Sequence, residues 1–180
     1  AQLLALRPDL QVQSIRGNVQ TRLAKLDSGE FDAIVLAQAG LSRLQLQRAD
    51  AHPLDIRTCL PAPGQGALGI EVLAESPVTA LLESLVEPDV ARCVQAERGI
   101  SAGLGADCAL PVAAHAMLES DGKMRLRALV AMPDGSKILR AEGLGTNADV
   151  LASKVVEQLL AQGAQAILDA AQGAAQGAKK

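Results

Sequence analysis

The pattern of apolar and polar positions predicts strands alternating with helices in the first part of the chain. Apolar or β-branched runs typical of strands occupy residues 11–15, 33–37 and 67–73. Helical spacing follows the first run, from Asn18 as a predicted N-cap to Gly29, and a short helix is predicted over 41–46. This order of strand, helix, strand and helix predicts an α/β unit of βαβ type with a right-handed crossover.

A different pattern follows in the second part. Helices are predicted from Ser76 to Val86 and from Asp89 to Leu104. Three strands are predicted over 112–119, 124–132 and 137–143, with turns at Asp121-Gly122 and Pro133-Asp134-Gly135. Residues 147–171 form an amphipathic helical region with a break at Gly163, and residues 172–180 are expected to be disordered. This second unit is therefore predicted to be α+β, a three-stranded antiparallel sheet with helices.

The two patterns are separated by a stretch rich in proline and glycine at residues 60–66. Its continuation, Gly64-Gln65-Gly66-Ala67-Leu68-Gly69, fits the spacing G-x-G-x-x-G. A dinucleotide-binding loop with this spacing follows a strand and opens a helix, whereas here the string opens a predicted strand. A hinge or a close backbone approach is the better interpretation.

The composition of the chain argues against several kinds of binding partner, namely nucleic acid, membranes and metal ions. Apolar residues make up 49% of the 180 residues, aromatic residues 1%, and the net charge is −3, so there is no general attraction to nucleic acid or to an anionic membrane. No apolar run approaches the ~20 residues of a membrane span. The three cysteines have no Cys-x-x-Cys spacing, which favours a reducing compartment such as the cytoplasm. His52 and His115 lack the spacing of metal ligands, so we expect no metal site.

Three arginines follow predicted strands. Arg16 and Arg22 flank the start of the Asn18 helix, and Arg43 comes just after the run at 33–37. Sites in open α/β sheets form beyond the carboxyl ends of strands, and guanidinium groups bind carboxylates in pairs. These residues are candidates for an anion site, and the alternative is three solvated arginines.

Cys108 lies in a loop of small residues, Gly103-Leu104-Gly105-Ala106-Asp107-Cys108-Ala109. A carboxylate beside a thiol raises its pKa, so Asp107 argues against a catalytic thiolate. A thiol that tethers a group once tolerates an ordinary pKa, and the alternative is a loop cysteine without function.

Cys59 and Cys93 are interpreted as structural. Glu97 and Arg98 are interpreted as a solvated or paired part of a helix.

Several motifs, taken together, resemble the porphobilinogen deaminase (hydroxymethylbilane synthase) family. The resemblance covers nearly the whole chain, in matching order and spacing. It rests on Ser14-Ile15-Arg16-Gly17-Asn18-Val19-Gln20-Thr21-Arg22-Leu23, residues 32–37 with Ala39-Gly40-Leu41, residues 60–67, Ala96-Glu97-Arg98, the Cys108 loop with Pro111, and residues 126–130 with Pro133-Asp134-Gly135.

The resemblance implies a division into domains. The family has two domains like those of periplasmic binding proteins, with the active site between them, and a third α+β domain that carries a cysteine. On that pattern residues 1–59 are the later part of domain two, 60–87 cross back into domain one, 88–171 are the C-terminal domain, and 172–180 are a tail. The chain opens as an uncapped helix end, so we expect a C-terminal portion of a longer, typically monomeric enzyme. The family's essential aspartate is expected outside it, so the chain alone is expected to be inactive.

The resemblance also implies the chemistry. Cys108 matches the cysteine that holds a dipyrromethane cofactor by a thioether. The family adds four porphobilinogen units to this primer with release of ammonia, and then frees hydroxymethylbilane for tetrapyrrole and haem biosynthesis. By position, Arg16, Arg22 and Arg43 pair with acetate and propionate groups, and Ser14 with the backbone of Leu36, Ala37 and Gly40 lines the same cleft.

The chain departs from the family at Asp107, and an alternative function is also open. The family often has a small residue where this chain has Asp107, which is expected to alter the loop or to slow primer attachment. The alternative function, from a different class, is a non-catalytic anion- or small-ligand-binding module of periplasmic-binding-protein type. The cysteine discriminates between the two, because a simple binder does not need Cys108.

Overall fold

The computed structural model describes residues 1–106 and 110–177. Its centre is an antiparallel sheet of order β1-β2-β3, formed by β1 (Val112–Leu118), β2 (Met124–Ala131) and β3 (Ile138–Gly145). Gly122 and Gly135 occupy the two hairpin turns with φ of 77° and 78°, a backbone region that favours glycine. The prediction of a three-stranded antiparallel sheet in the second part of the chain is confirmed.

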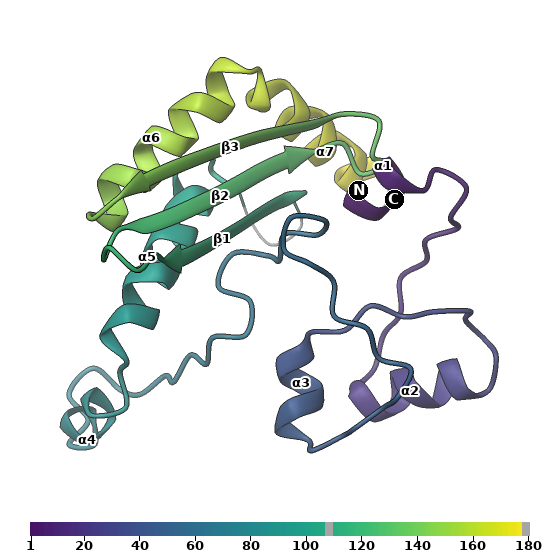
Figure 1. The fold of residues 1–180 in the computed structure, drawn as a ribbon, viewed down its shortest axis with the longest axis horizontal. Helices are drawn as coiled ribbons and strands as arrows, with labels where there is room; N and C mark the ends of the chain where they lie inside the picture. Colours follow the sequence, from purple (N-terminus) through teal and green to yellow (C-terminus); the bar gives the residue numbers. More distant parts are fainter. Residues whose placement is uncertain (107–109, 178–180) are drawn as a thin grey trace.

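One helix precedes the three strands in the sequence and two follow them. The first, α5 (Pro88–Gly103), and the second, α6 (Ala148–Ala161), lie along one face of the sheet (Figure 1). Asn147 caps α6, since its side-chain oxygen accepts a hydrogen bond from the Val150 N–H at 3.0 Å. The break predicted at Gly163 is confirmed, and α7 (Ala164–Gly177) follows it. α7 ends at Gly177, inside the stretch 172–180 for which disorder was expected, and that expectation stays a prediction. Alanine and glutamine are good helix formers, and α7 packs against the core through Ile167 and Leu168.

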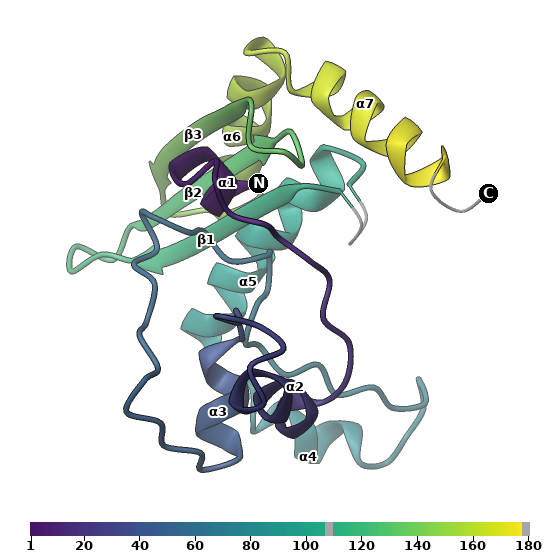
Figure 2. The ribbon, with the colours of Figure 1, turned by 90° about the vertical axis from the view of Figure 1, so that its right-hand side faces the viewer.

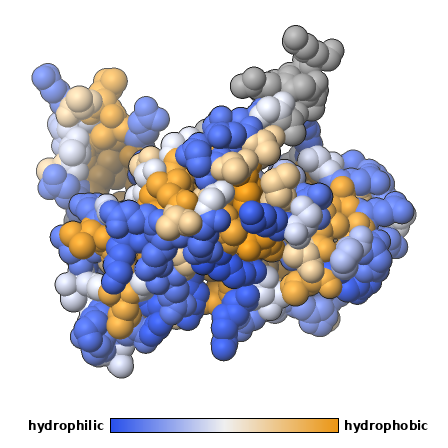
Figure 3. Space-filling model, turned by 90° about the horizontal axis from the view of Figure 1, so that it is seen from above, coloured by the Kyte–Doolittle hydropathy of each residue, from blue (hydrophilic) through white to orange (hydrophobic). Residues whose placement is uncertain are grey.

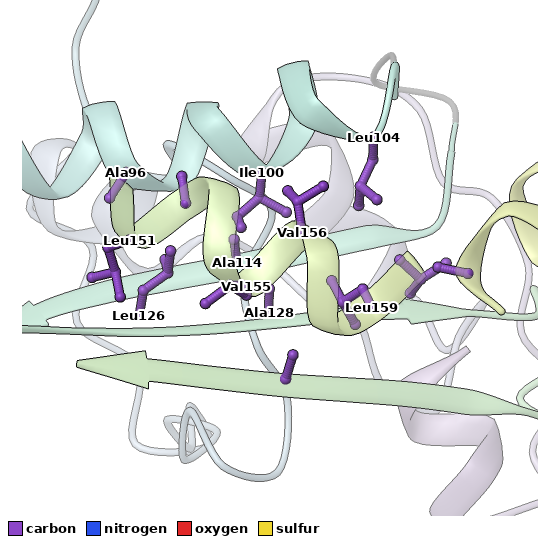
Figure 4. Packing of buried hydrophobic residues seen from close by; sticks show 14 of the residues in the cluster. Ala96, Ile100, Leu104, Ala114, Leu126, Ala128, Leu151, Val155, Val156 and Leu159 are labelled. Carbon is purple, nitrogen blue, oxygen red and sulfur yellow. The ribbon is translucent and has the colours of Figure 1, made fainter. Parts of the chain in front are cut away.

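The hydrophobic core fills the space between these helices and the sheet. Figure 4 shows Ala96, Ile100 and Leu104 pointing from α5 toward the side chains of α6. Ile100, Leu126 and Leu159 are fully buried there. Full burial of such side chains contributes about 1.5–3 kcal/mol each, so this core stabilises the α+β unit.

The second face of the sheet is covered by the segment rich in proline and glycine, residues 60–66. This segment connects the two halves of the chain and is called the joint. Leu60 is buried there against Ala113, Leu129 and Ala131. The short helix α1 (Gln2–Leu6) lies beside it, and the Gln2 side chain hydrogen-bonds the N–H and the C=O of Leu60, at 2.8 Å each. The start of the Pro/Gly-rich segment is therefore fixed to the C-terminal sheet.

The first part of the chain contains three further helices, α2 (Val19–Asp27), α3 (Gln38–Arg43) and α4 (Thr79–Glu83). Figure 2 shows them below the sheet, joined to it by extended segments. Asn18 caps α2 as predicted, because its side chain accepts from the Thr21 N–H at 2.8 Å. The helix predicted over 41–46 begins earlier, at Gln38, and the one predicted over 76–86 is limited to α4.

The strands predicted over 11–15, 33–37 and 67–73 were wrong for this structure, and so was the βαβ layout built on them. None of the three segments forms a strand, and the only sheet in the described part of the chain is β1-β2-β3. A strand exists only where a neighbouring strand accepts and donates its backbone hydrogen bonds, and these runs have no such neighbour here. Each run leaves a large apolar side chain exposed, namely Val12, Val35 and Ile70.

Apolar side chains also reach the surface elsewhere. Leu73, Leu81 and Leu85 are among the most exposed. On the face drawn in Figure 3, apolar residues form several patches between polar ones. Within the described residues, the helices are too short or too polar to cross a membrane.

Candidate functional site

Two of the predicted arginines lie beside the contact between α2 and α3. A Cβ atom added to Gly40 on α3 would lie 3.5 Å from the Val19 side chain on α2. Arg22 follows Val19 by three residues and Arg43 follows Gly40 by three residues, and residues so spaced share a helix face. Arg22 and Arg43 therefore each lie one helical turn after a residue of the α2–α3 contact.

Each of these arginines is oriented by a backbone carbonyl. The Arg22 Nε donates to the Gly17 oxygen at 2.8 Å, and an Arg43 terminal nitrogen donates to the Gly66 oxygen at 2.7 Å. A guanidinium group has five N–H donors, so one carbonyl leaves most of them free to bind a carboxylate. Gly17 has a φ of 114°, which places the chain at the start of α2 in a conformation that glycine adopts readily.

The arginines of residues 1–106 and 110–177 fall into two groups, those with an acidic side chain at ion-pair distance and those without one, and the second group also includes Arg98 and Arg140. Across residues 1–106 and 110–177, no ion pair joins Arg16, Arg22 or Arg43 to an acidic side chain. Other arginines do have acidic partners at ion-pair distance, namely Arg7, Arg48, Arg57, Arg92, Arg125 and Arg127. The three predicted arginines are therefore positive charges without a described counter-charge.

The remaining predicted site residues surround α3 or precede α2. Ala37 precedes the first residue of α3, and its carbonyl accepts from the Gly40 N–H at 2.9 Å. Leu36 is half-buried next to it, whereas Ser14 and Arg16 are exposed in the segment before α2. The structure groups Leu36, Ala37, Gly40 and Arg43 around α3. No described contact joins Ser14 or Arg16 to that group.

Cys108 and Asp107 lie outside the described residues. The residues on either side of this stretch, Ala106 and Leu110, both line a hollow of about 750 Å³. Ala62 and Pro63 from the joint form another part of its wall, and Arg98 lines it from α5. The wall of this hollow contains one basic side chain, Arg98, and one acidic side chain, Asp149, and neither was predicted to take part in a site.

The expectation for Glu97, a solvated or paired position, was wrong. Its side chain is buried, with 7% of its surface exposed. Its two carboxylate oxygens accept hydrogen bonds from the Gly64 N–H at 2.7 Å and from the Ala116 N–H at 2.8 Å. Burial raises the pKa of the nearby Cys93 thiol, and the Glu97 charge raises it further.

A signal for this burial was present in the sequence. Glu97 lies at the spacing of an apolar helix stripe, on the same face as Cys93, Ile100 and Leu104. A carboxylate on such a stripe is buried, and it then requires hydrogen-bond donors. Gly64 donates its N–H to Glu97 with a φ of 73°, but a Cβ added there would meet no atom within 4 Å, so the interpretation of Gly64-Gln65-Gly66 as a hinge or a close backbone approach stays a prediction.

A dipyrromethane cofactor carries acetate and propionate groups, and the residues present fit such a group. Arg16, Arg22 and Arg43 supply guanidinium donors whose charge is not offset by an acidic side chain in the described chain. Guanidinium forks match carboxylates in geometry as well as in charge. The donor set thus suits a polycarboxylate ligand.

Comparison with known proteins agrees with this chemistry. A family model described as "Porphobilinogen deaminase, dipyromethane cofactor binding domain" matches residues 1–80, and one described as "Porphobilinogen deaminase, C-terminal domain" matches residues 91–161. The first match thus assigns residues 1–80 to a domain that binds a dipyrromethane cofactor. Together the two models cover most of the chain, and the start of α5 lies in the interval between them, residues 81–90.

Curated proteins show the same relationship. A porphobilinogen deaminase of Thiobacillus denitrificans is 49% identical over 173 residues, which cover 94% of this chain and 56% of that protein. One of Acidithiobacillus ferrooxidans is 49% identical over 170 residues, which cover 94% of this chain and 55% of that protein. The chain spans about half the length of these curated relatives. With two family models and these relatives in agreement, the chain belongs to the porphobilinogen deaminase family.

Proposed function

We propose that the full-length protein is a hydroxymethylbilane synthase, which joins four porphobilinogen units to a cysteine-bound dipyrromethane primer and releases ammonia. The observation that carries this proposal is the set of three arginines, Arg16, Arg22 and Arg43, without acidic partners in the described chain. A substrate with several carboxylates supplies the missing counter-charges. The family membership supplies the reaction.

The residues of this chain hold and orient the substrate. Cys108 holds the dipyrromethane by a thioether, and the cofactor supplies the primer that is extended. Arg22 and Arg43 bind acetate or propionate groups near the α2–α3 contact, with Arg16 as a further donor. Ser14 and the backbone of Leu36, Ala37 and Gly40 line the same site.

We also propose the domain division implied by the family. Residues 1–59 form the later part of a periplasmic-binding-protein-like domain, 60–87 cross to the first domain, and 88–171 form the C-terminal domain. The exposed apolar runs that include Val12, Val35 and Ile70 support this, because their composition suits burial against further chain. The buried cluster formed by α5, α6, α7 and the sheet supports the boundary near residue 88.

Intact mass spectrometry of the full-length protein tests the proposed function. The wild type is expected to exceed the polypeptide mass by one dipyrromethane, and Cys108→Ser is expected to have the bare mass. Cys59→Ser is the matched control, since it removes a thiol elsewhere, and it is expected to keep the adduct. A wild type with the bare mass that does not consume porphobilinogen would favour the alternative of a non-catalytic binding module.

A further inference from the structure

Glu97 is the charged side chain that the described part of the chain buries. It lies on α5 between Ala96 and Ile100, both of which are fully buried in the core. Removing a carboxylate from water is unfavourable unless hydrogen bonds replace its hydration. The groups that donate hydrogen bonds to the Glu97 carboxylate therefore show which parts of the fold it stabilises.

Both partners are backbone N–H groups from other parts of the chain. Oε2 accepts from Gly64, in the joint, and Oε1 accepts from Ala116, on β1. β1 is an edge strand, and its neighbouring N–H at Ala114 donates to the Pro61 carbonyl at 3.1 Å. The joint and Glu97 thus each accept a hydrogen bond from one outward N–H group of β1, so the carboxylate connects the joint to both α5 and the sheet.

The same joint also holds one of the substrate-binding candidates. Gln65 and Ala67 close two consecutive turns by donating to the carbonyls of Ala62 and Gly64. Within these turns the Gly66 carbonyl accepts from the Arg43 guanidinium at 2.7 Å. Arg43 and Glu97 are thus hydrogen-bonded to the same turn, Arg43 at the Gly66 carbonyl and Glu97 at the Gly64 N–H, and the turn is closed by the bond from the Ala67 N–H to the Gly64 carbonyl.

We infer that Glu97 is a positioning residue: its carboxylate fixes the turn at 62–67, and thereby the Arg43 guanidinium, relative to the unit that carries Cys108. This inference rests on the proposed function, in which Cys108 holds the substrate chain and Arg43 binds its carboxylates. A ligand held at two points binds well only if the distance between those points is fixed. Glu97 contacts neither the cofactor nor the substrate, and acts through the turn.

Glu97→Gln is the informative variant. Glutamine has nearly the same shape but offers one acceptor oxygen and one NH₂ group, whereas the site needs two acceptors. One of the two backbone N–H groups therefore faces a donor. The strand that carries Ala116 is held in place by its pairing with β2, whereas Gly64 lies in a turn without such pairing, so the expected loss is at Gly64 and the turn is expected to become mobile.

The first measurement does not depend on activity. Amide hydrogen exchange and the guanidinium NMR signal of Arg43 are recorded for the wild type, Glu97→Gln and Glu157→Gln, with Glu157 as a matched exposed glutamate on α6. In Glu97→Gln, exchange at Gly64 is expected to rise about tenfold or more and the Arg43 signal to broaden or shift. Glu157→Gln is expected to match the wild type. Unchanged Gly64 exchange and an unchanged Arg43 signal in Glu97→Gln would overturn the inference.

The second measurement is a double-mutant cycle on the full-length protein, with covalent cofactor confirmed by intact mass in each variant. Glu97→Gln and Arg43→Ala are each expected to raise the KM for porphobilinogen about tenfold, and the double variant no more than either alone. Multiplied effects, or a loss of kcat with unchanged KM, would mean that Glu97 is only structural. A wild type without cofactor would refute the proposed function, whereas the exchange and NMR data would still decide whether Glu97 fixes the turn and Arg43.

Discussion

Gly99 on α5 lies directly against Ala152 on α6. A Cβ atom added to Gly99 would be 2.6 Å from the Ala152 Cβ, a distance that real Cβ atoms do not adopt. One turn further along, a Cβ at Gly103 would be 2.9 Å from a Val156 methyl group. The two helices therefore approach each other through glycines, and this approach closes the core over the sheet.

Replacement of Gly99 by alanine is expected to destabilise the fold. The added methyl group forces α5 and α6 apart, and overpacking of this kind costs about 1–3 kcal/mol. The free energy of unfolding, measured by urea denaturation, checks this. Gly173→Ala on α7 is the control, because no atom lies within 4 Å of its added Cβ. The control is expected to be neutral or to stabilise by up to ~1 kcal/mol, and equal losses in both variants would contradict the packing argument.

The two hairpin glycines give a second matched pair. Gly122→Ala and Gly135→Ala both introduce a side chain at positive φ, which costs about 1 kcal/mol. A Cβ at Gly135 would also lie 2.6 Å from the Ala5 backbone nitrogen in α1, whereas nothing lies within 4 Å of one at Gly122. Gly135→Ala is therefore expected to destabilise more than Gly122→Ala and to accelerate exchange of the Ala5 N–H. Identical unfolding curves for the two variants would mean that α1 does not dock on this turn.

Arg22→Ala in the full-length protein is expected to impair primer assembly or chain elongation. The change removes a guanidinium that has no acidic partner in the described chain, and loss of such a carboxylate contact reduces turnover about tenfold or more. Turnover of porphobilinogen and the mass of the covalent intermediates measure the effect. Arg57→Ala, which removes an exposed arginine paired with Asp55, is the control and is expected to keep full activity. Unchanged turnover in Arg22→Ala would remove Arg22 from the site.

Asp50 provides a prediction about pH. The hydrogen bonds from Arg48 lower the pKa of the Asp50 carboxyl from its usual 3.8 to about 2. A carboxyl whose pKa is lower in the folded state stabilises that state above about pH 4, and this contribution disappears as the pH falls through about 2. An NMR titration of the side-chain carboxyl is expected to give the low midpoint in the wild type. Arg48→Ala is expected to move the midpoint toward 3.8, and Arg57→Ala is not.

Local signals predicted much of the fold because they act within a few residues. Asn18 and Asn147 cap helices through their own side chains, and Gly122 and Gly135 permit the backbone of the two hairpin turns. The pattern over 112–143 predicted the three-stranded sheet for the same reason, since consecutive strands joined by short turns find their partners close in the chain. For the candidate site, the role of the arginines stays a prediction, and the structure adds the backbone carbonyls that orient Arg22 and Arg43, those of Gly17 and Gly66.

What the sequence determined by itself is therefore the position of caps, turns and the arginines, together with the family. Only the tertiary structure decided which segments have partners. The runs at 11–15, 33–37 and 67–73 have strand-like composition, yet they form no ladder, because a strand needs hydrogen bonds from another segment. Glu97 shows the reverse case: its position on α5 is local, but its burial depends on Gly64 and Ala116, which lie elsewhere in the chain. Burial and pairing are properties of contacts between distant residues, and for that reason they emerged only from the folded chain.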